Sequence, residues 1–178
     1  YDVAHVAEPD PISISSSSKQ DITCNGLGDG SISVSAAGES GIYNYELNPG
    51  AVSQATGNFT GLPANTYTVT VSDNSVFGCS SSAIAGPFTI NDPIPIGIGT
   101  ETSRDISCFG SGDGEVEVKG TGGTTPYTYT LNPGALQTNS SGLFTGLSAG
   151  IYSVDITDKN NCPTATSSPL QVNEPGEI

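Results

Sequence analysis

Basic residues and the largest side chains are scarce in this chain. It has no Trp, no Met, a single His and only 4 Lys or Arg against 18 Asp or Glu, giving a formal net charge of −14. No basic stripe exists to neutralise phosphate, so we expect no binding to nucleic acid. The acidic surface also argues against docking on an anionic membrane. No apolar run is long enough to span a bilayer, so we expect no direct membrane insertion either.

What the chain does have is an internal repeat. Residues 24–51 align with residues 108–135 without a gap at a shift of 84 positions, and residues 59–73 align with 144–158 after a slip of one. A module used in series usually sets reach and presentation rather than chemistry. The domains that we expect are the end of a preceding repeat or linker at 1–11, a first repeat at 12–93 and a second repeat at 94–178.

Both copies read as β-strands. Apolar and polar residues alternate along short runs, Asn-Gly, Asp-Gly and Asn-Pro-Gly turn signals separate these runs, and no helical spacing is present. Many short strands in about 84 residues predict an all-β fold, with two tandem immunoglobulin-like antiparallel β-sandwich domains. Tyrosines on the apolar side of one predicted strand in each copy are expected to fill the core: Tyr43, Tyr45, Tyr127 and Tyr129.

A further tyrosine in each copy begins a later strand. Tyr67 follows Gly-Leu-x-Ala-x-x and precedes Val69-x-Val71-x-Asp, and Tyr152 stands in the same pattern of the second copy. In immunoglobulin-like domains a tyrosine at this place bonds back to the backbone at the strand's corner. We therefore expect Tyr67 and Tyr152 to be structural.

The four cysteines form one pair per copy. No Cys-x-x-Cys occurs, so a zinc site is not expected. Four cysteines allow three pairings, and the repeat symmetry favours Cys24–Cys79 and Cys108–Cys162. Closing a loop of about 55 residues would stabilise each thin core by roughly 4 kcal/mol in the chain-entropy model. Disulfides also predict an oxidising compartment, outside the cell or in a periplasm.

Catalytic chemistry is hard to find. His5 is the only histidine and lies outside the repeated part, so a Ser-His-Asp triad in each copy is excluded. Glu115 and Glu117 share one strand face, as a glycosidase pair would, but Ser31 and Ser33 replace them in the first copy. A solvated strand face explains them, and we expect no enzyme.

Calcium is the alternative role for the acidic residues, although no cofactor is required by the sequence. Carboxylates stand at equivalent turns, at equivalent strand ends and beside the proline that ends the first copy, and a hard cation binds such oxygen ligands. Aspartate is equally ordinary in turns, where it bonds its own backbone, and no EF-hand spacing is present. The candidate ligands are Asp29, Asp113, Asp73, Asp158 and Asp92.

A linker rich in proline joins the two copies. Residues 91–96 read Asn-Asp-Pro-Ile-Pro-Ile, and residues 8–12 have a similar pattern. Prolines two apart hold the backbone extended, which predicts a semi-rigid spacer.

The order of these motifs resembles the SprB repeat family. Each copy has Cys-x-Gly-x-x-Asp-Gly, paired tyrosines before a leucine, Phe-x-Gly-Leu-x-Ala, a strand that begins with tyrosine, a second cysteine, and a closing Asp-Pro or Glu-Pro. The family takes its name from the large gliding-motility adhesin of Bacteroidetes-type gliding bacteria. The resemblance covers almost the whole chain and occurs twice.

The resemblance implies a very long, secreted cell-surface protein, exported by the type IX route and carried along the cell by the gliding machinery. It implies an extracellular location with outer-membrane attachment through the parent protein. The implied partners are neighbouring repeats of the same chain and, through the parent, the gliding machinery. No catalytic residue is carried over from the family.

These observations predict a structural and adhesive repeat segment that acts as a disulfide-stapled extension module in gliding motility and surface attachment. The alternative is a module that binds surface polysaccharide, which would require exposed tyrosines in place of buried ones. An accessory domain of a secreted protein is a third interpretation.

Overall fold

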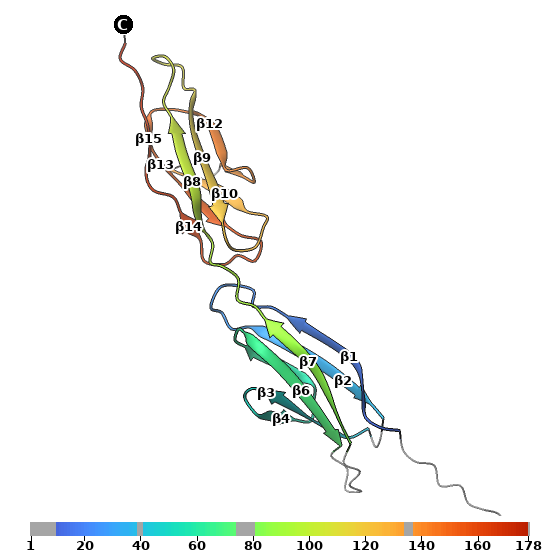
Figure 1. Ribbon diagram of the computed structural model, residues 1–178. Helices are drawn as coiled ribbons and strands as arrows, with labels where there is room; N and C mark the ends of the chain where they lie inside the picture. The colour runs from blue at the N-terminus through green and yellow to red at the C-terminus, as the bar shows by residue number, and fades with distance from the viewer. Residues whose placement is uncertain (1–9, 39–40, 74–80, 134–136, 178) are drawn as a thin grey trace, which may run out of the picture. The chain divides into compact units, whose positions relative to one another are not determined.

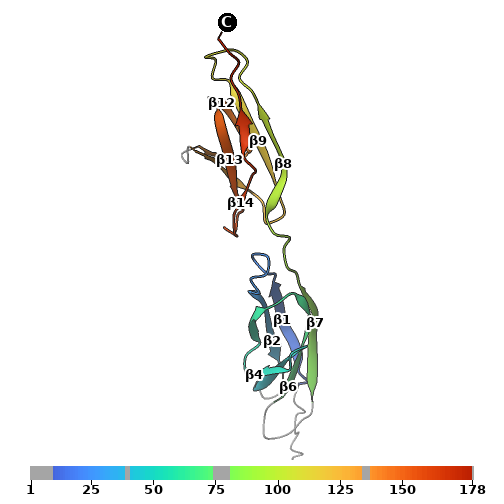
Figure 2. The same cartoon turned by 90° about the vertical axis from the view of Figure 1, so that its left-hand side faces the viewer.

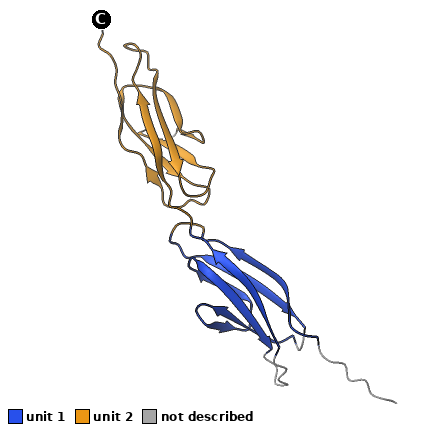
Figure 3. Ribbon diagram, in the orientation of Figure 1, with its two compact units in different colours: residues 1–22, 26–92 blue, residues 23–25, 93–178 orange. Residues whose placement is uncertain are grey.

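The computed structural model describes residues 10–38, 41–73, 81–133 and 137–177. Within these ranges the chain forms fifteen strands and no α-helix, so none of the described segments is a helix long and apolar enough to cross a membrane. The chain divides into two compact units, coloured separately in Figure 3. One unit is Tyr1–Ile22 with Gly26–Asp92, and the other is Thr23–Asn25 with Pro93–Ile178.

The first unit is a sandwich of two antiparallel sheets. A three-stranded sheet has the order β1-β2-β5 and a four-stranded sheet has the order β4-β3-β6-β7 (Figure 1). The strands are β1 (Ser13–Gln20), β2 (Gly30–Ala37), β3 (Tyr43–Asn48), β4 (Val52–Gln54), β5 (Asn58–Leu62), β6 (Asn65–Asp73) and β7 (Ser82–Ile90).

The second unit repeats this arrangement. Its three-stranded sheet has the order β12-β9-β8, and its second sheet has the order β11-β10-β13-β14, with β15 also paired to β13 (Figures 1 and 2). The strands are β8 (Gly97–Arg104), β9 (Gly114–Thr121), β10 (Thr128–Asn132), β11 (Thr138–Asn139), β12 (Leu143–Leu147), β13 (Gly150–Thr157), β14 (Ala165–Thr166) and β15 (Leu170–Val172). The single strand β7 of the first unit thus corresponds to two short strands here.

The alternation seen in the sequence places one apolar face of each sheet inside. On β2 and β9 the inward residues are Ile32 and Val34, and Val116 and Val118, all buried. The facing sheet contributes Leu47, Val69 and Val71 in the first unit and their counterparts in the second. Because side chains on a strand alternate with a period of two, the serine and glutamate residues between these positions face outward. The predicted all-β fold is confirmed.

A glycine before β12 shows how closely the connection from β11 to β12 approaches strand β9. The amide of Val118 donates a hydrogen bond of 2.9 Å to the carbonyl of Gly142. Gly142 has a φ of +76°, and a Cβ at this place would lie 2.0 Å from the Val118 carbonyl oxygen. Glycine is therefore required here both by its backbone conformation and by the lack of space.

Candidate functional site

The tyrosines near the starts of β6 and β13 bond to the turns that precede these strands. The hydroxyl of Tyr67 donates a 3.0 Å hydrogen bond to the carbonyl of Pro63, and that of Tyr152 donates a 2.9 Å bond to the carbonyl of Ser148. Each tyrosine thus reaches back four residues, as in a tyrosine corner. Burial raises the pKa of Tyr67, and its hydroxyl therefore stays protonated as a donor.

The paired tyrosines of β3 and β10 belong to the cores. Tyr45 and Tyr129 are only 7% and 4% exposed. Tyr43 and Tyr127 are half-buried and pack against the same clusters. Each pair meets edge to face with ring centroids 6.2 Å apart, a favourable aromatic arrangement. These rings are not presented as a flat platform of the kind on which a sugar stacks.

The cysteines are paired differently from the prediction. A disulfide joins Cys24 to Cys162, whose Cα atoms are 5.5 Å apart, and Cys108 is free and exposed. Cys108 is therefore not bonded to Cys162, and Cys24 is not bonded to Cys79, which lies outside the described residues. Both predicted pairings are wrong for the described cysteines.

The position of β13 explains why Cys108 and Cys162 do not pair. The segment before Cys108 bonds to the chain just after β15, where the amide of Ile106 donates to the carbonyl of Asn173. Strand β13 starts beside β15, since Gly150 pairs with Val172, and it runs eight residues before the loop that holds Cys162. Eight residues of strand cover roughly 26 Å, whereas disulfide Cα atoms lie within about 7 Å.

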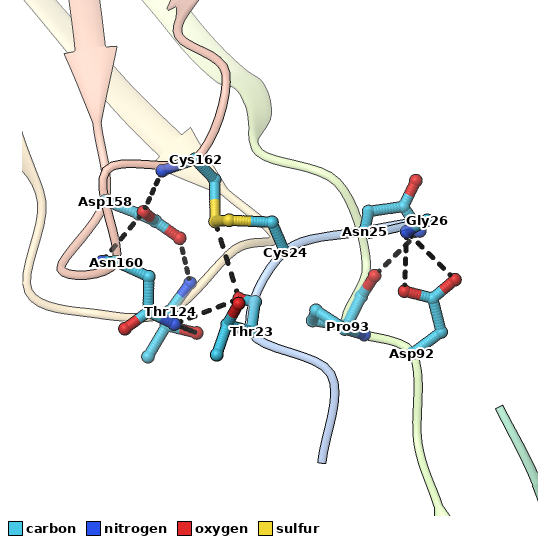
Figure 4. The surroundings of a disulfide bond; sticks show 10 residues. All are labelled: Thr23, Cys24, Asn25, Gly26, Asp92, Pro93, Thr124, Asp158, Asn160 and Cys162. Atoms are coloured by element: carbon cyan, nitrogen blue, oxygen red, sulfur yellow. Dashed lines mark hydrogen bonds between the residues drawn. A yellow bond between two sulfur atoms is a disulfide. The ribbon is translucent and has the colours of Figure 1, made fainter. Parts of the chain in front are cut away.

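The disulfide lies within the second unit as the contacts define it, because Thr23–Asn25 group with that unit. In sequence, however, these three residues belong to the first copy of the repeat. The carbonyl oxygen of Thr23 accepts a 3.0 Å hydrogen bond from the Asn160 side chain and lies 3.4 Å from the Cys162 sulfur (Figure 4). The side chain of Asn25 donates to the carbonyl of Pro93 at 2.9 Å. The segment is thus held on both sides of Cys24.

Asp158 shapes the loop that presents Cys162. This side chain is buried at 4% exposure, and it accepts hydrogen bonds from the backbone amides of Cys162, Thr124 and Asn160 at 3.0, 2.9 and 3.0 Å (Figure 4). Burial by itself raises the pKa of Asp158, but the three amide donors outweigh it and leave the pKa below its ordinary value of 3.8. Asp158 is thus a charged residue that organises the loop backbone.

A second set of carboxylates fixes the loops that carry the first cysteines. Asp21 accepts from the amide of Asn91 at 2.9 Å, and Asp105 accepts from the amide of Asn173 at 2.8 Å. Two residues after each first cysteine, a glycine amide bonds to an acidic side chain. The amide of Gly26 donates to Asp92 at 2.9 Å and the amide of Gly110 donates to Glu174 at 2.7 Å. The pKa of Asp21 is lowered, first by its bond to Lys19 and then by the amide of Asn91.

The five aspartates considered as calcium ligands do not gather in one place. Asp158 and Asp92 accept backbone amides in different loops, and Asp113 accepts the amide of Ser107 at 2.9 Å. Asp29 and Asp73 each have an interaction of their own. Among the described residues, no three His, Cys, Asp or Glu side chains come together as metal ligands would. Calcium binding stays a prediction.

The two glutamates of β9 pair with cations at the surface. Glu115 forms an ion pair with Arg104, and Glu117 forms one of 2.7 Å with Lys119. Each glutamate thus has a cation as its neighbour, and all four side chains are at least one-third exposed. Such pairs contribute little to stability, and this is the arrangement of a solvated strand face.

Among solved structures, the chain is similar to the three N-terminal domains of the highly immunogenic outer capsid protein (Hoc) of bacteriophage RB49. The identity is 17% and the TM-score 0.51, over 92% of this chain and 59% of that one. It is also similar to immunoglobulin domains 1–4 of Sidekick-1, with 10% identity and a TM-score of 0.44 over 95% of this chain and 50% of that one. No curated protein matches the chain. The two antiparallel sheets of each unit, the tyrosine corners and the similarity to the Hoc domains confirm the predicted immunoglobulin-like fold.

The family comparison agrees with the sequence motifs. The SprB repeat model matches residues 16–52 and again residues 100–136. The matched segments begin within β1 and β8 and include both loops with a first cysteine, so they cover equivalent parts of the two sandwiches. Together with the immunoglobulin-like fold, the matches indicate repeat domains of the type found in cell-surface adhesins. The chain therefore contains two segments, one in each copy of its internal repeat, that match the SprB repeat family.

Proposed function

We propose that this chain is an extension segment of a secreted cell-surface adhesin that serves gliding motility and surface attachment. In this function the repeats hold an adhesive region away from the outer membrane and present it. The chain itself turns over no substrate. Its partners are neighbouring repeats and, through the parent protein, the gliding machinery.

The observation that carries the proposal is what the two copies share. They preserve the core positions and the contacts that hold loops, such as the amide bonds to Asp92 and to Glu174. The outward face of the same strands differs, since Ser31 and Ser33 stand where Glu115 and Glu117 do. A ligand site used by every repeat would be preserved between copies, whereas an extension module needs only its fold and its joints.

The main alternative is a module that binds polysaccharide in each repeat. The burial of Tyr45 and Tyr129 speaks against it, because sugar sites use exposed aromatic faces. The role of an accessory domain in another secreted protein would leave the extension role of the segment unchanged.

The test uses beads coated with a polymer layer. One set displays a carbohydrate-binding domain directly on the bead, a second displays the same domain at the end of this chain, and a third displays this chain alone. We expect glycan particles to bind only the second set, because only there does the domain stand beyond the polymer.

The third set also tests the alternative. It is incubated with surface polysaccharides in calcium and again in EDTA. Binding to this chain alone would favour the polysaccharide-binding module, and binding only in calcium would implicate Asp29, Asp113 and the other loop aspartates. Equal glycan capture by the first two sets would contradict the extension function.

A further inference from the structure

The loop that carries Cys108 repeats the loop that carries Cys24. Cys108 lies 84 positions after Cys24 and has the same place in the Cys-x-Gly-x-x-Asp-Gly motif. It is exposed and has no disulfide partner among the described residues. Its counterpart Cys24 is bonded to Cys162.

The backbone of the two loops is held by the same contacts. The amides of Ile22 and Ile106 donate to the carbonyls of Asn91 and Asn173 at 3.1 and 2.9 Å. The amides of Gly26 and Gly110 donate to the acidic residues that close the two repeats, as described above. Cys108 is therefore presented by a loop already built in the form in which Cys24 makes its disulfide.

The sequence positions of the bonded cysteines give a pairing rule. Cys24 is the first cysteine of the first copy, and Cys162 is the second cysteine of the second copy. In the second copy, Cys162 is out of reach of Cys108, because the length of β13 separates the two. The first cysteine of one copy is thus paired with the second cysteine of the copy that follows.

The residue beside Cys108 is a second observation that points to a partner. Phe109 is 56% exposed, although a phenylalanine at a loop tip gains nothing from solvent. It occupies the place of Asn25. Asn25 lines a cavity of about 290 Å³ in the second unit, together with Cys162, Pro163 and the proline-rich segment 93–96. At the corresponding place, the Phe109 ring would lie beside Pro175 and beside the loop of the following repeat that holds its second cysteine.

We propose that Cys108 forms a disulfide with the second cysteine of a following SprB repeat, so that each repeat is covalently joined to the next through equivalent loops. The loop that receives Cys108 would resemble the one shaped by Asp158. This pairing is independent of the proposed function, because an array that binds polysaccharide could be linked in the same way.

The reaction needs a two-electron oxidant, which a small-molecule disulfide such as oxidised glutathione supplies. One cysteine thiolate attacks the small disulfide, forms a mixed disulfide and releases one small thiol. The second thiolate then attacks the mixed disulfide, forms the Cys–Cys bond and releases the other small thiol. The two cysteines lose two electrons and two protons in total, and the two released thiols carry them.

The test extends the full chain by one repeat. Residues 97–178 are added after Ile178, which has the same place in the repeat as Ile96. Two cysteines that would have no partner in the extended chain are replaced by serine. They are the second cysteine of the first copy, removed by Cys79→Ser, and the first cysteine of the added copy. The chain is oxidised with glutathione disulfide, alkylated, digested with trypsin and mapped without reduction.

Trypsin distinguishes the two candidate partners of Cys108. In the extended chain, trypsin cleaves after both copies of Lys159 and after Arg104 of the added copy. Cys162 of the second repeat is therefore on a longer peptide, which continues into the added copy as far as that arginine. The corresponding cysteine of the added repeat is on a shorter peptide, which ends at the C-terminus. We expect the peptide of Cys108 to be linked to the shorter one, and that of Cys24 to the longer one. Alkylation of Cys108 should fall at least tenfold relative to the unextended chain.

The peptide links that are found decide between the proposal and its alternatives. A Cys24–Cys162 link with Cys108 still alkylated would overturn the proposal, because Cys108 would then have stayed a free thiol although the second cysteine of the added repeat was present. A link between Cys108 and Cys162 of its own repeat would overturn it as well, and so would the absence of both expected links. Phe109→Ser in the extended chain is a matched variant, which should slow formation of the Cys108 link and leave the Cys24 link unchanged.

Discussion

The Cys24–Cys162 disulfide should hide most of the chain from a stretching force applied at its two ends. The two cysteines are separated by 138 positions in sequence, and a fully extended chain gains at most about 3.5 Å per residue. When the bond is intact, tension passes from Cys24 to Cys162 through sulfur, and the residues between them carry none. Reduction should therefore release roughly 480 Å of additional extension.

Single-molecule pulling on the chain measures this length directly. In oxidising buffer we expect only the ends outside the closed loop to extend, including β1 on one side and β15 on the other. With reductant, or with Cys24→Ser in oxidising buffer, the full length of both sandwiches should unravel. Cys108→Ser is the matched control, since it removes a cysteine that has no disulfide partner among the described residues.

The alternative pairings would give a different record. A Cys108–Cys162 bond would close 54 positions (108 to 162) and hide roughly 190 Å, which Cys108→Ser would then release. Extra length from Cys108→Ser, or equal lengths with and without reductant, would refute the Cys24–Cys162 assignment.

Two further predictions concern the second unit, and thermal unfolding of single variants measures both. Asp158→Asn should cost about 2 kcal/mol near neutral pH, because the charged acceptor of three amides is lost. Since the pKa of Asp158 is lowered on folding, its contribution is complete above the ordinary value of 3.8 and disappears as the pH falls through the lowered value. The variant and the parent should therefore converge in acid, and a gap that does not change with pH would argue against this role. Gly142→Ala should cost about 3 kcal/mol, because it combines a positive φ with a Cβ placed 2.0 Å from a carbonyl oxygen. Gly146→Ala is its control: the φ of +73° is nearly the same, but the nearest atom lies 4.0 Å away, so a loss of only about 1 kcal/mol is expected. Equal losses would show that the close contact contributes nothing.

The fold could be predicted because its signal is local. Alternation along Tyr67-x-Val69-x-Val71 fixes which side of β6 is buried, and a second copy of the same pattern in β13 removes the ambiguity of a single short strand. The split of β7 into β14 and β15 was not predictable in this way, since the two copies are least alike in that region.

The disulfide could not be predicted from symmetry alone. A repeat fixes which cysteines are equivalent, but a rule that pairs cysteines within a copy and one that pairs them between copies are both compatible with it. What decides is distance along a strand. Tyr152 marks the start of β13, and Cys162 follows its end, so the cysteine before β9 and the one after β13 belong to opposite ends of the sandwich. The number of strand residues between Tyr152 and Cys162 is already too large for the short distance that a Cys108–Cys162 disulfide requires.

The same covalent bond has a consequence for a protein that is exposed to proteases. A single backbone cut anywhere between Cys24 and Cys162 leaves both products in one molecule, because the sulfur bridge still joins them. Two nicks within this interval would be needed to lose any part of it, and the chain from Cys24 back to its first residue would still be connected to the chain beyond Cys162. Damage at one loop would thus leave the segment's continuity intact.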